Sequence, residues 1–286
     1  PVEHVVLPCN AFEHKAPMQA FVKKYPQAQV WIAPGQFGPL GSCGTSLQQK
    51  PCTMGYRVDG ILGPDQPQPS WANEFDIATL YVELPKNAGP VSEVAFCHRP
   101  TKTLIATDSL IFVPSRPNLD IFATYFGKNV IENDPTFWPR TVLQAVFLPL
   151  RSVETTTGTT IYPGYEAIQN RLIRAPILRA LVDARAPEAV RDWIQQQTTH
   201  WDFDRILTSH FASPIQATPT QVRQAFDYLF TNVDRVDDDR SYSSNQLPPL
   251  QCQDWDLLSG INQIVNDSNA GAPIVLDFTK PCVQSE

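Results

Sequence analysis

The chain has 286 residues, and its 22 Lys and Arg against 29 Asp and Glu give a formal charge of −7. This acidic balance does not supply the basic surface that a nucleic acid or an anionic membrane requires, so we expect no nucleic-acid partner. No apolar run approaches the ~18 residues of a membrane span, which predicts a soluble, globular protein without a transmembrane segment.

Short apolar runs punctuate the first half of the chain and predict β-strands. These runs are residues 5–7, 29–33, 79–84, 93–97 and 103–106. Between the first two runs, Met18, Phe21 and Val22 stand at helical spacing, which predicts a strand–helix–strand unit. Residues 35–71 are rich in Gly, Pro, Ser and Gln and lack periodicity, so we expect an irregular insertion on the surface.

The second half of the chain favours helices. Apolar spacing predicts them over residues 171–184, 187–197, 218–230 and 256–265, and a further strand over 205–207. Pro187 followed by Glu188 is a typical first turn, because Pro lacks the unused donor and Glu complements the helix dipole.

A charged run and a Ser/Asn/Pro-rich stretch after residue 233 predict a domain boundary. We therefore expect a domain over residues 1–233, a linker over 234–250 and a C-terminal docking segment over 251–286. This last segment carries one apolar stripe, formed by Trp255, Leu257, Leu258, Ile261 and Ile264, and an apolar run at 274–276. It should pack on the domain or on a partner protein.

The six cysteines contain no C-x-x-C pair, which argues against a structural zinc site. Cys43 and Cys52 flank a short stretch of the 35–71 loop, and we expect them to form a disulfide of an oxidising compartment in preference to reduced thiols. Whether Cys252 pairs with Cys282 stays open at this stage.

Polar side chains follow three of the predicted strands. Glu13 and His14 come after the first strand, Asp108 after the fifth and His210 after the strand at 205–207. Each alone fits a solvated turn or a cap, but strand ends in layered α/β proteins commonly aim side chains into one crevice. Two imidazoles with two carboxylates could hold zinc, iron or manganese.

Several blocks around these residues resemble a family catalogued as domain of unknown function 4336. The blocks are residues 5–8, 13–15, 21–26, 28–34, 93–98, 103–108, 175–178, 191–193 and 205–214. The resemblance covers roughly residues 2–229, outside the 35–70 loop and the segment after 234. That family is in turn similar to the metallo-β-lactamase superfamily. The resemblance therefore implies a layered α/β fold, namely an αββα sandwich. This sandwich would be incomplete at its N-terminus and would carry a C-terminal extension.

The superfamily motif is H-x-H-x-D-H, followed by a separate His, a bridging Asp and a final His. By this resemblance Cys9 and Ala11 replace the first two histidines, Glu13 takes the place of the Asp, and His14 that of the last His. Asp108 would then be the bridging Asp. The first metal site is therefore expected to be lost.

By the same resemblance His210 stands at the final His, so the second metal site is expected to be retained. His98 precedes Asp108 by only ten residues, and we expect it to flank a hairpin turn instead of binding metal.

Two functions follow. One is a metal-dependent hydrolase with one divalent ion on His14, Asp108 and His210, in which Glu13 is a fourth ligand or the general base, with the substrate open. The other is a non-catalytic accessory subunit of a larger, photosynthetic assembly, without metal, docking through the 35–71 loop or the C-terminal segment. The resemblance implies a chloroplast location, with a transit peptide removed before Pro1, and the cytoplasm is the alternative.

Overall fold

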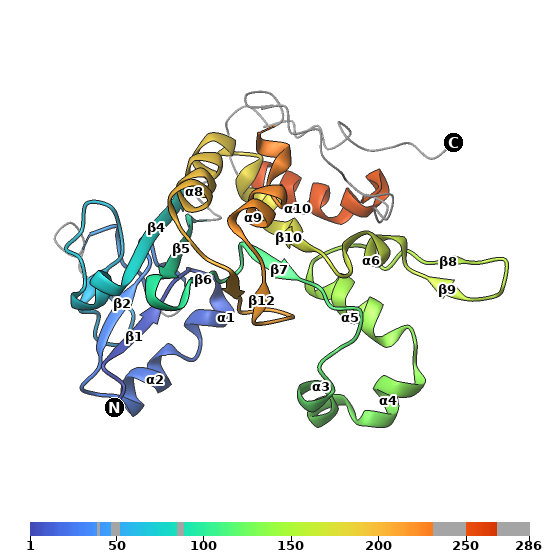
Figure 1. Cartoon of the computed structure of the whole chain (residues 1–286), viewed down its shortest axis with the longest axis horizontal. Coiled ribbons are helices and arrows are strands. Elements are labelled where there is room, and N and C mark those ends of the chain that lie inside the picture. Colours follow the sequence, from blue (N-terminus) through green and yellow to red (C-terminus); the bar gives the residue numbers. More distant parts are fainter. Residues whose placement is uncertain (39–40, 47–51, 85–88, 231–249, 268–286) are drawn as a thin grey trace.

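The computed structural model describes residues 1–38, 41–46, 52–84, 89–230 and 250–267 (Figure 1). These residues form a mixed α/β fold, in which the strands assemble into several sheets surrounded by helices. No helix of this described part has the length and apolarity needed to cross a bilayer.

The first sheet is parallel and contains three strands in the order β1-β2-β3. They are β1 (His4–Leu7), β2 (Gln29–Ile32) and β3 (Gly60–Ile61). Two helices, α1 (Phe12–Lys15) and α2 (Met18–Lys24), connect β1 to β2. The predicted strand–helix–strand unit is therefore confirmed.

The second sheet has five strands in the order β12-β11-β6-β5-β4. They are β4 (Phe75–Val82), β5 (Val91–His98), β6 (Thr103–Ile105), β11 (Arg205–Leu207) and β12 (Ile215–Gln216). β6 and β11 run parallel, and the other neighbours are antiparallel. The turn between β5 and β6 is a single 3₁₀ turn, Arg99–Thr101.

The two sheets pack face to face, and helices cover both outer faces. Side chains alternate along each strand: Trp31 of β2 and Phe96 of β5 lie in the apolar layer between the sheets. Their neighbours Ile32 and Cys97 face outwards, towards α2 and towards α8 (Pro187–His200) with α9 (Pro219–Gln224). The core is thus a stack of helix, sheet, sheet and helix.

The remaining elements form a second buried apolar cluster beside this stack. Its strands are the antiparallel pair β7 (Leu110–Phe112) and β10 (Leu172–Arg174), and a hairpin of β8 (Val153–Glu154) and β9 (Thr160–Ile161) projects from it (Figure 1). The helices that contribute to it are α3 (Leu119–Phe126), α5 (Phe137–Ala145), α6 (Pro163–Ile168), α7 (Pro176–Leu178) and α10 (Asp256–Asp267). A further helix, α4 (Lys128–Asn133), lies between α3 and α5 in the chain.

The 35–71 segment is not the wholly superficial insertion that its composition predicts. Cys43, Met54 and Ile61 are buried against the first sheet, and β3 extends that sheet beside β2. A two-residue strand leaves no periodicity in the sequence, because its pairing is decided by the backbone of the neighbouring strand.

The helix predicted over residues 171–184 is also wrong in its first part. Leu172–Arg174 form β10, which pairs with β7. Pro176 starts a new helix, because its ring cannot follow a preceding helical turn, and a π-helical turn over Arg179–Asp183 follows. The helix predicted over 218–230 ends at Gln224 and continues as a 3₁₀ turn, Asp227–Leu229.

The described part of the C-terminal segment packs on the protein as expected. Trp255 and Leu258 are buried in the second cluster, and Ile261 packs against it. Leu257 and Ile264 are exposed, so the apolar stripe is narrower than predicted. The linker at 234–249 and the run at 274–276 lie outside the described residues.

Candidate metal centre

Three strand ends carry the candidate ligands to one edge of the stack. Asp108 follows β6 and His210 follows β11, and these strands are parallel neighbours, so their carboxyl ends lie together. α1 carries His14 from the other sheet (Figure 1). β5 pairs with β6 only through Phe96–His98, so the amide of Val94 is free to donate to the carbonyl of Pro8 (2.7 Å). This hydrogen bond holds the chain that leads into α1 beside β5, and His14 therefore reaches the site.

Two imidazoles converge on one carboxylate oxygen. Nε2 of His14 lies 2.9 Å from Oδ1 of Asp108, and Nε2 of His210 lies 2.8 Å from the same oxygen. The two rings are tilted by 59°, with their centroids 5.4 Å apart. All three residues are half-buried, so the cluster is accessible from solvent.

These contacts shift the protonation of the site. Burial raises the pKa of the Asp108 carboxyl, but the hydrogen bonds from His14 and His210 outweigh it and hold the pKa well below its usual range. The bond to Asp108 raises the pKa of His14 above its usual 6.5, although burial opposes this. Asp108 is therefore charged at neutral pH, and its charge would attract a metal cation to the two imidazoles.

Glu13 completes the cluster from the same turn of α1. One ligand atom each from Glu13, His14, Asp108 and His210 lies within 4.8 Å of the others. Imidazole nitrogen and carboxylate oxygen suit zinc, iron and manganese. The four residues predicted as a metal site are thus brought together, and their donor set fits a single divalent ion.

Cys9 and Ala11, which the sequence analysis placed at the first two motif positions by resemblance, precede Glu13 in the chain. Cys9 is a buried free thiol, and burial, with the charges of Asp108 and Glu93, raises its pKa far above the usual value. Without a metal ion its thiol is therefore protonated at neutral pH, and Cys9 is not among the four residues whose ligand atoms come together. Ala11 offers no ligand atom.

His98 lies outside the cluster, as expected. It ends β5, and its Nδ1 is 2.7 Å from the hydroxyl of Thr101 in the hairpin turn.

In the insertion, Cys43 and Cys52 form a disulfide with their Cα atoms 4.3 Å apart. This bond ties the loop to the buried face of the first sheet through Cys43. Cys282 lies outside the described residues.

One buried acidic residue beside the site was missed. Glu93 was assigned only to an apolar strand, yet it is 3% exposed and adjoins the loop that carries Asp108. An acidic residue within an otherwise apolar run is a signal that could have identified it, because buried carboxylates need dedicated partners.

The model of a family described as a domain of unknown function (DUF4336) matches residues 1–162 and 121–228. The chain belongs to this family. All four residues of the cluster lie within the matched segments of DUF4336. No curated protein and no solved structure matches the chain. DUF4336 membership is thus confirmed, whereas these matches carry no support for a link to the metallo-β-lactamases.

Proposed function

We propose that this DUF4336 protein is a metal-dependent hydrolase with a single divalent ion on His14, Asp108 and His210 and with Glu13 beside it. The observation that carries the proposal is the convergence of two imidazole nitrogens on one charged carboxylate oxygen in a solvent-accessible site. Purely structural histidines at strand ends more commonly satisfy separate backbone groups.

The proposed relationship to the metallo-β-lactamase superfamily has two supports. The helix, sheet, sheet and helix stack is the layering that an αββα sandwich requires. The cluster also consists of the residues that the resemblance aligns with the superfamily's second metal site, and their ligand atoms lie together. Cys9 is not among the residues whose ligand atoms converge, and Ala11 has no ligand atom, which supports one ion instead of two.

A bound ion would lower the pKa of a coordinated water and polarise a substrate oxygen. His14, Asp108 and His210 would hold that ion. Glu13 is the exposed member of the cluster, so its carboxylate lies where it can accept a proton from a water at the rim. Hydrolysis is therefore the reaction class that the arrangement supports best.

The first experiment is elemental analysis of purified protein. We expect about one zinc, iron or manganese per chain, with loss of the metal in His14→Ala, Asp108→Asn and His210→Ala. His200→Ala is the matched control, because His200 is exposed at the end of α8, where its Nδ1 lies 3.2 Å from the carbonyl of Gln196. Wild-type protein that takes up no metal on reconstitution would refute the proposal.

An accessory subunit is the second candidate, because α3 and α4 expose a cluster of apolar side chains. These are Leu119, Ile121, Tyr125, Phe126 and Val130, and Tyr125 is 80% exposed. Exposed apolar clusters commonly mark protein interfaces. Two results together would favour this function. The folded protein would take up no metal, and it would self-associate or form a complex that the double variant Ile121→Ser, Tyr125→Ser loses.

Chloroplast residence is proposed from the resemblance described in the sequence analysis. The Cys43–Cys52 disulfide supports an oxidising compartment over the cytoplasm. Labelling of free thiols in protein extracted under acid quench, followed by mass spectrometry of the peptides that hold Cys43 and Cys52, tests whether the bond exists in the cell.

A further inference from the structure

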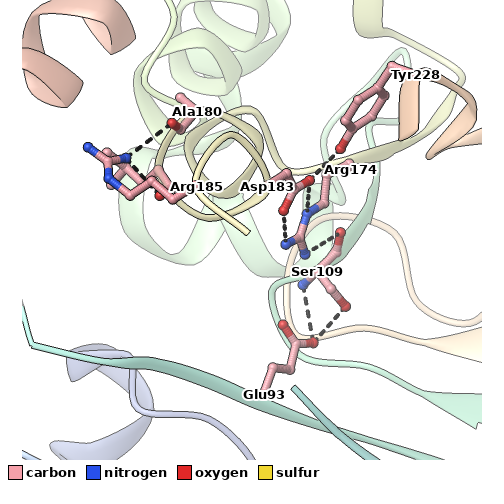
Figure 2. A network of polar contacts seen from close by, with 8 residues as sticks. Glu93, Ser109, Arg174, Ala180, Asp183, Arg185 and Tyr228 are labelled. Atoms are coloured by element: carbon pink, nitrogen blue, oxygen red, sulfur yellow. Dashed lines mark hydrogen bonds and ion pairs between the residues drawn. The ribbon is translucent and has the colours of Figure 1, made fainter. Parts of the chain in front are cut away.

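The loop that carries Asp108 is attached to a buried carboxylate on the neighbouring strand (Figure 2). Oε1 of Glu93 accepts hydrogen bonds from the amide of Thr107 (2.9 Å), and from the amide (3.2 Å) and hydroxyl (2.6 Å) of Ser109. These donors stand immediately before and after Asp108. The carboxylate therefore fixes the backbone on both sides of the central residue of the site.

The far side of this contact is anchored by a buried ion pair. Arg174 of β10 donates two hydrogen bonds to Asp183, at 3.0 and 2.6 Å, and its Nη1 reaches the carbonyl of Ser109 at 3.5 Å. Tyr228 donates to the same carboxylate of Asp183 (Figure 2). Ser109 is thus held between two buried groups that come from different elements.

Burying these groups is unfavourable unless they are fully paired. An apolar residue at position 93 would avoid the cost of burying a carboxyl, but it would leave the three donors of the loop without this acceptor. Glu93 accepts hydrogen bonds from three donors, and all three belong to residues adjacent to Asp108. Glu93 therefore fixes the backbone of this loop in particular. Outer groups of this kind commonly orient metal ligands.

We propose that Glu93 is a positioning residue that holds Asp108 in the conformation in which its Oδ1 meets both imidazoles, with Arg174 and Asp183 securing Ser109 from the other side. This inference rests on the proposed metal site. It assigns to Glu93 no contact with the ion or the substrate, and its role depends on the acceptor oxygen.

Two substitutions of Glu93 separate this role from others. Glu93→Ala removes the acceptor and should weaken Co²⁺ or Zn²⁺ binding about 10- to 100-fold, measured by competition with a chelating dye. Glu93→Gln keeps an acceptor oxygen, and burial together with the charge of Asp108 raises the pKa of the native carboxyl towards its neutral form. The Gln variant should therefore bind metal close to wild type and restore the wild-type Co²⁺ absorption spectrum.

Asp59→Ala is the matched control. Asp59 also accepts a backbone hydrogen bond, from the amide of Val30 (2.7 Å), but in the first sheet and outside the metal cluster. It should lower the melting temperature and leave metal affinity unchanged. Equal metal affinity in wild type and Glu93→Ala overturns the proposal, and so does equal loss in Glu93→Ala and Glu93→Gln, because the charge would then be what matters.

Two further measurements keep the test decisive. If Glu93→Ala does not fold, Ser109→Ala removes one donor and should weaken metal binding to a smaller extent; unchanged affinity then overturns the proposal. If wild-type protein binds no metal, the proposed function fails, and amide hydrogen exchange decides the positioning role. Exchange at Thr107 and Ser109 should accelerate in Glu93→Ala and not in Glu93→Gln, and equal rates would contradict it.

Discussion

Asp108 and His14 illustrate how two residues set each other's protonation. The carboxyl pKa of Asp108 is lowered, so its stabilisation is present above the usual value of 3.8 and is lost as the pH falls through the folded-state pKa. The imidazole pKa of His14 is raised. Its stabilisation is complete below 6.5 and is lost as the pH rises through the folded-state pKa.

We therefore predict a pH-dependent difference in stability between metal-free wild type and the Asp108→Asn variant. The difference in melting temperature should be largest between the usual pKa values of Asp, 3.8, and of His, 6.5, and should shrink as the pH rises through the raised pKa of His14. Differential scanning fluorimetry in the presence of a chelator measures it. A difference that stays constant from pH 5 to pH 9, roughly the range over which a raised His pKa titrates, would contradict the pKa shift.

At the scale of elements, α1 is a four-residue helix without a side-chain N-cap. A single turn is unstable in isolation, because nucleation is unfavourable. Lys15 anchors it, since Lys15 is buried and its Nζ donates to the carbonyl of Phe37 (2.6 Å). The orientation of Glu13 and His14 therefore depends on the loop after β2 as much as on their own sequence.

α10 provides a matched pair of leucines for testing the C-terminal packing. Leu258 is fully buried against the second apolar cluster, whereas its neighbour Leu257 is 47% exposed. Leu258→Ala should lower the free energy of unfolding by about 2–5 kcal/mol, because it leaves a cavity. Leu257→Ala should change it by less than about 0.5 kcal/mol. Urea denaturation gives both values, and similar losses in the two variants would show that α10 packs differently.

At the scale of the whole molecule, the C-terminal segment fills the second cluster through Trp255 and Leu258. Asp254 is also buried and forms an ion pair with Arg151, in which Nη2 of Arg151 lies 3.0 Å from Oδ1 of Asp254. A chain ending at residue 250 would therefore expose apolar surface and leave Arg151 without this partner. We predict a lower melting temperature and increased binding of an apolar dye, whereas an unchanged melting curve would show that the segment is dispensable.

Local sequence patterns were sufficient for most of the sheet core and for the candidate site. The runs at residues 5–7, 29–33 and 93–97 became β1, β2 and β5, and the Pro187–Glu188 start became α8. Polar residues at strand ends identified all four members of the cluster. These features can be predicted from the sequence because burial of one face of a strand or helix makes apolar residues recur at a short, regular spacing.

Contacts between distant residues determined the rest. β3 exists because β2 offers it a backbone to pair with, and β10 exists because β7 does. Asp108 contacts both histidines because the fold brings together strands that are distant in the chain. The same packing places Glu93 against the loop around Asp108. The sequence by itself determined which residue types stand at the strand ends. Only the tertiary structure decided their convergence on one oxygen, because hydrogen bonds between residues 94 and 102 positions apart leave no local pattern.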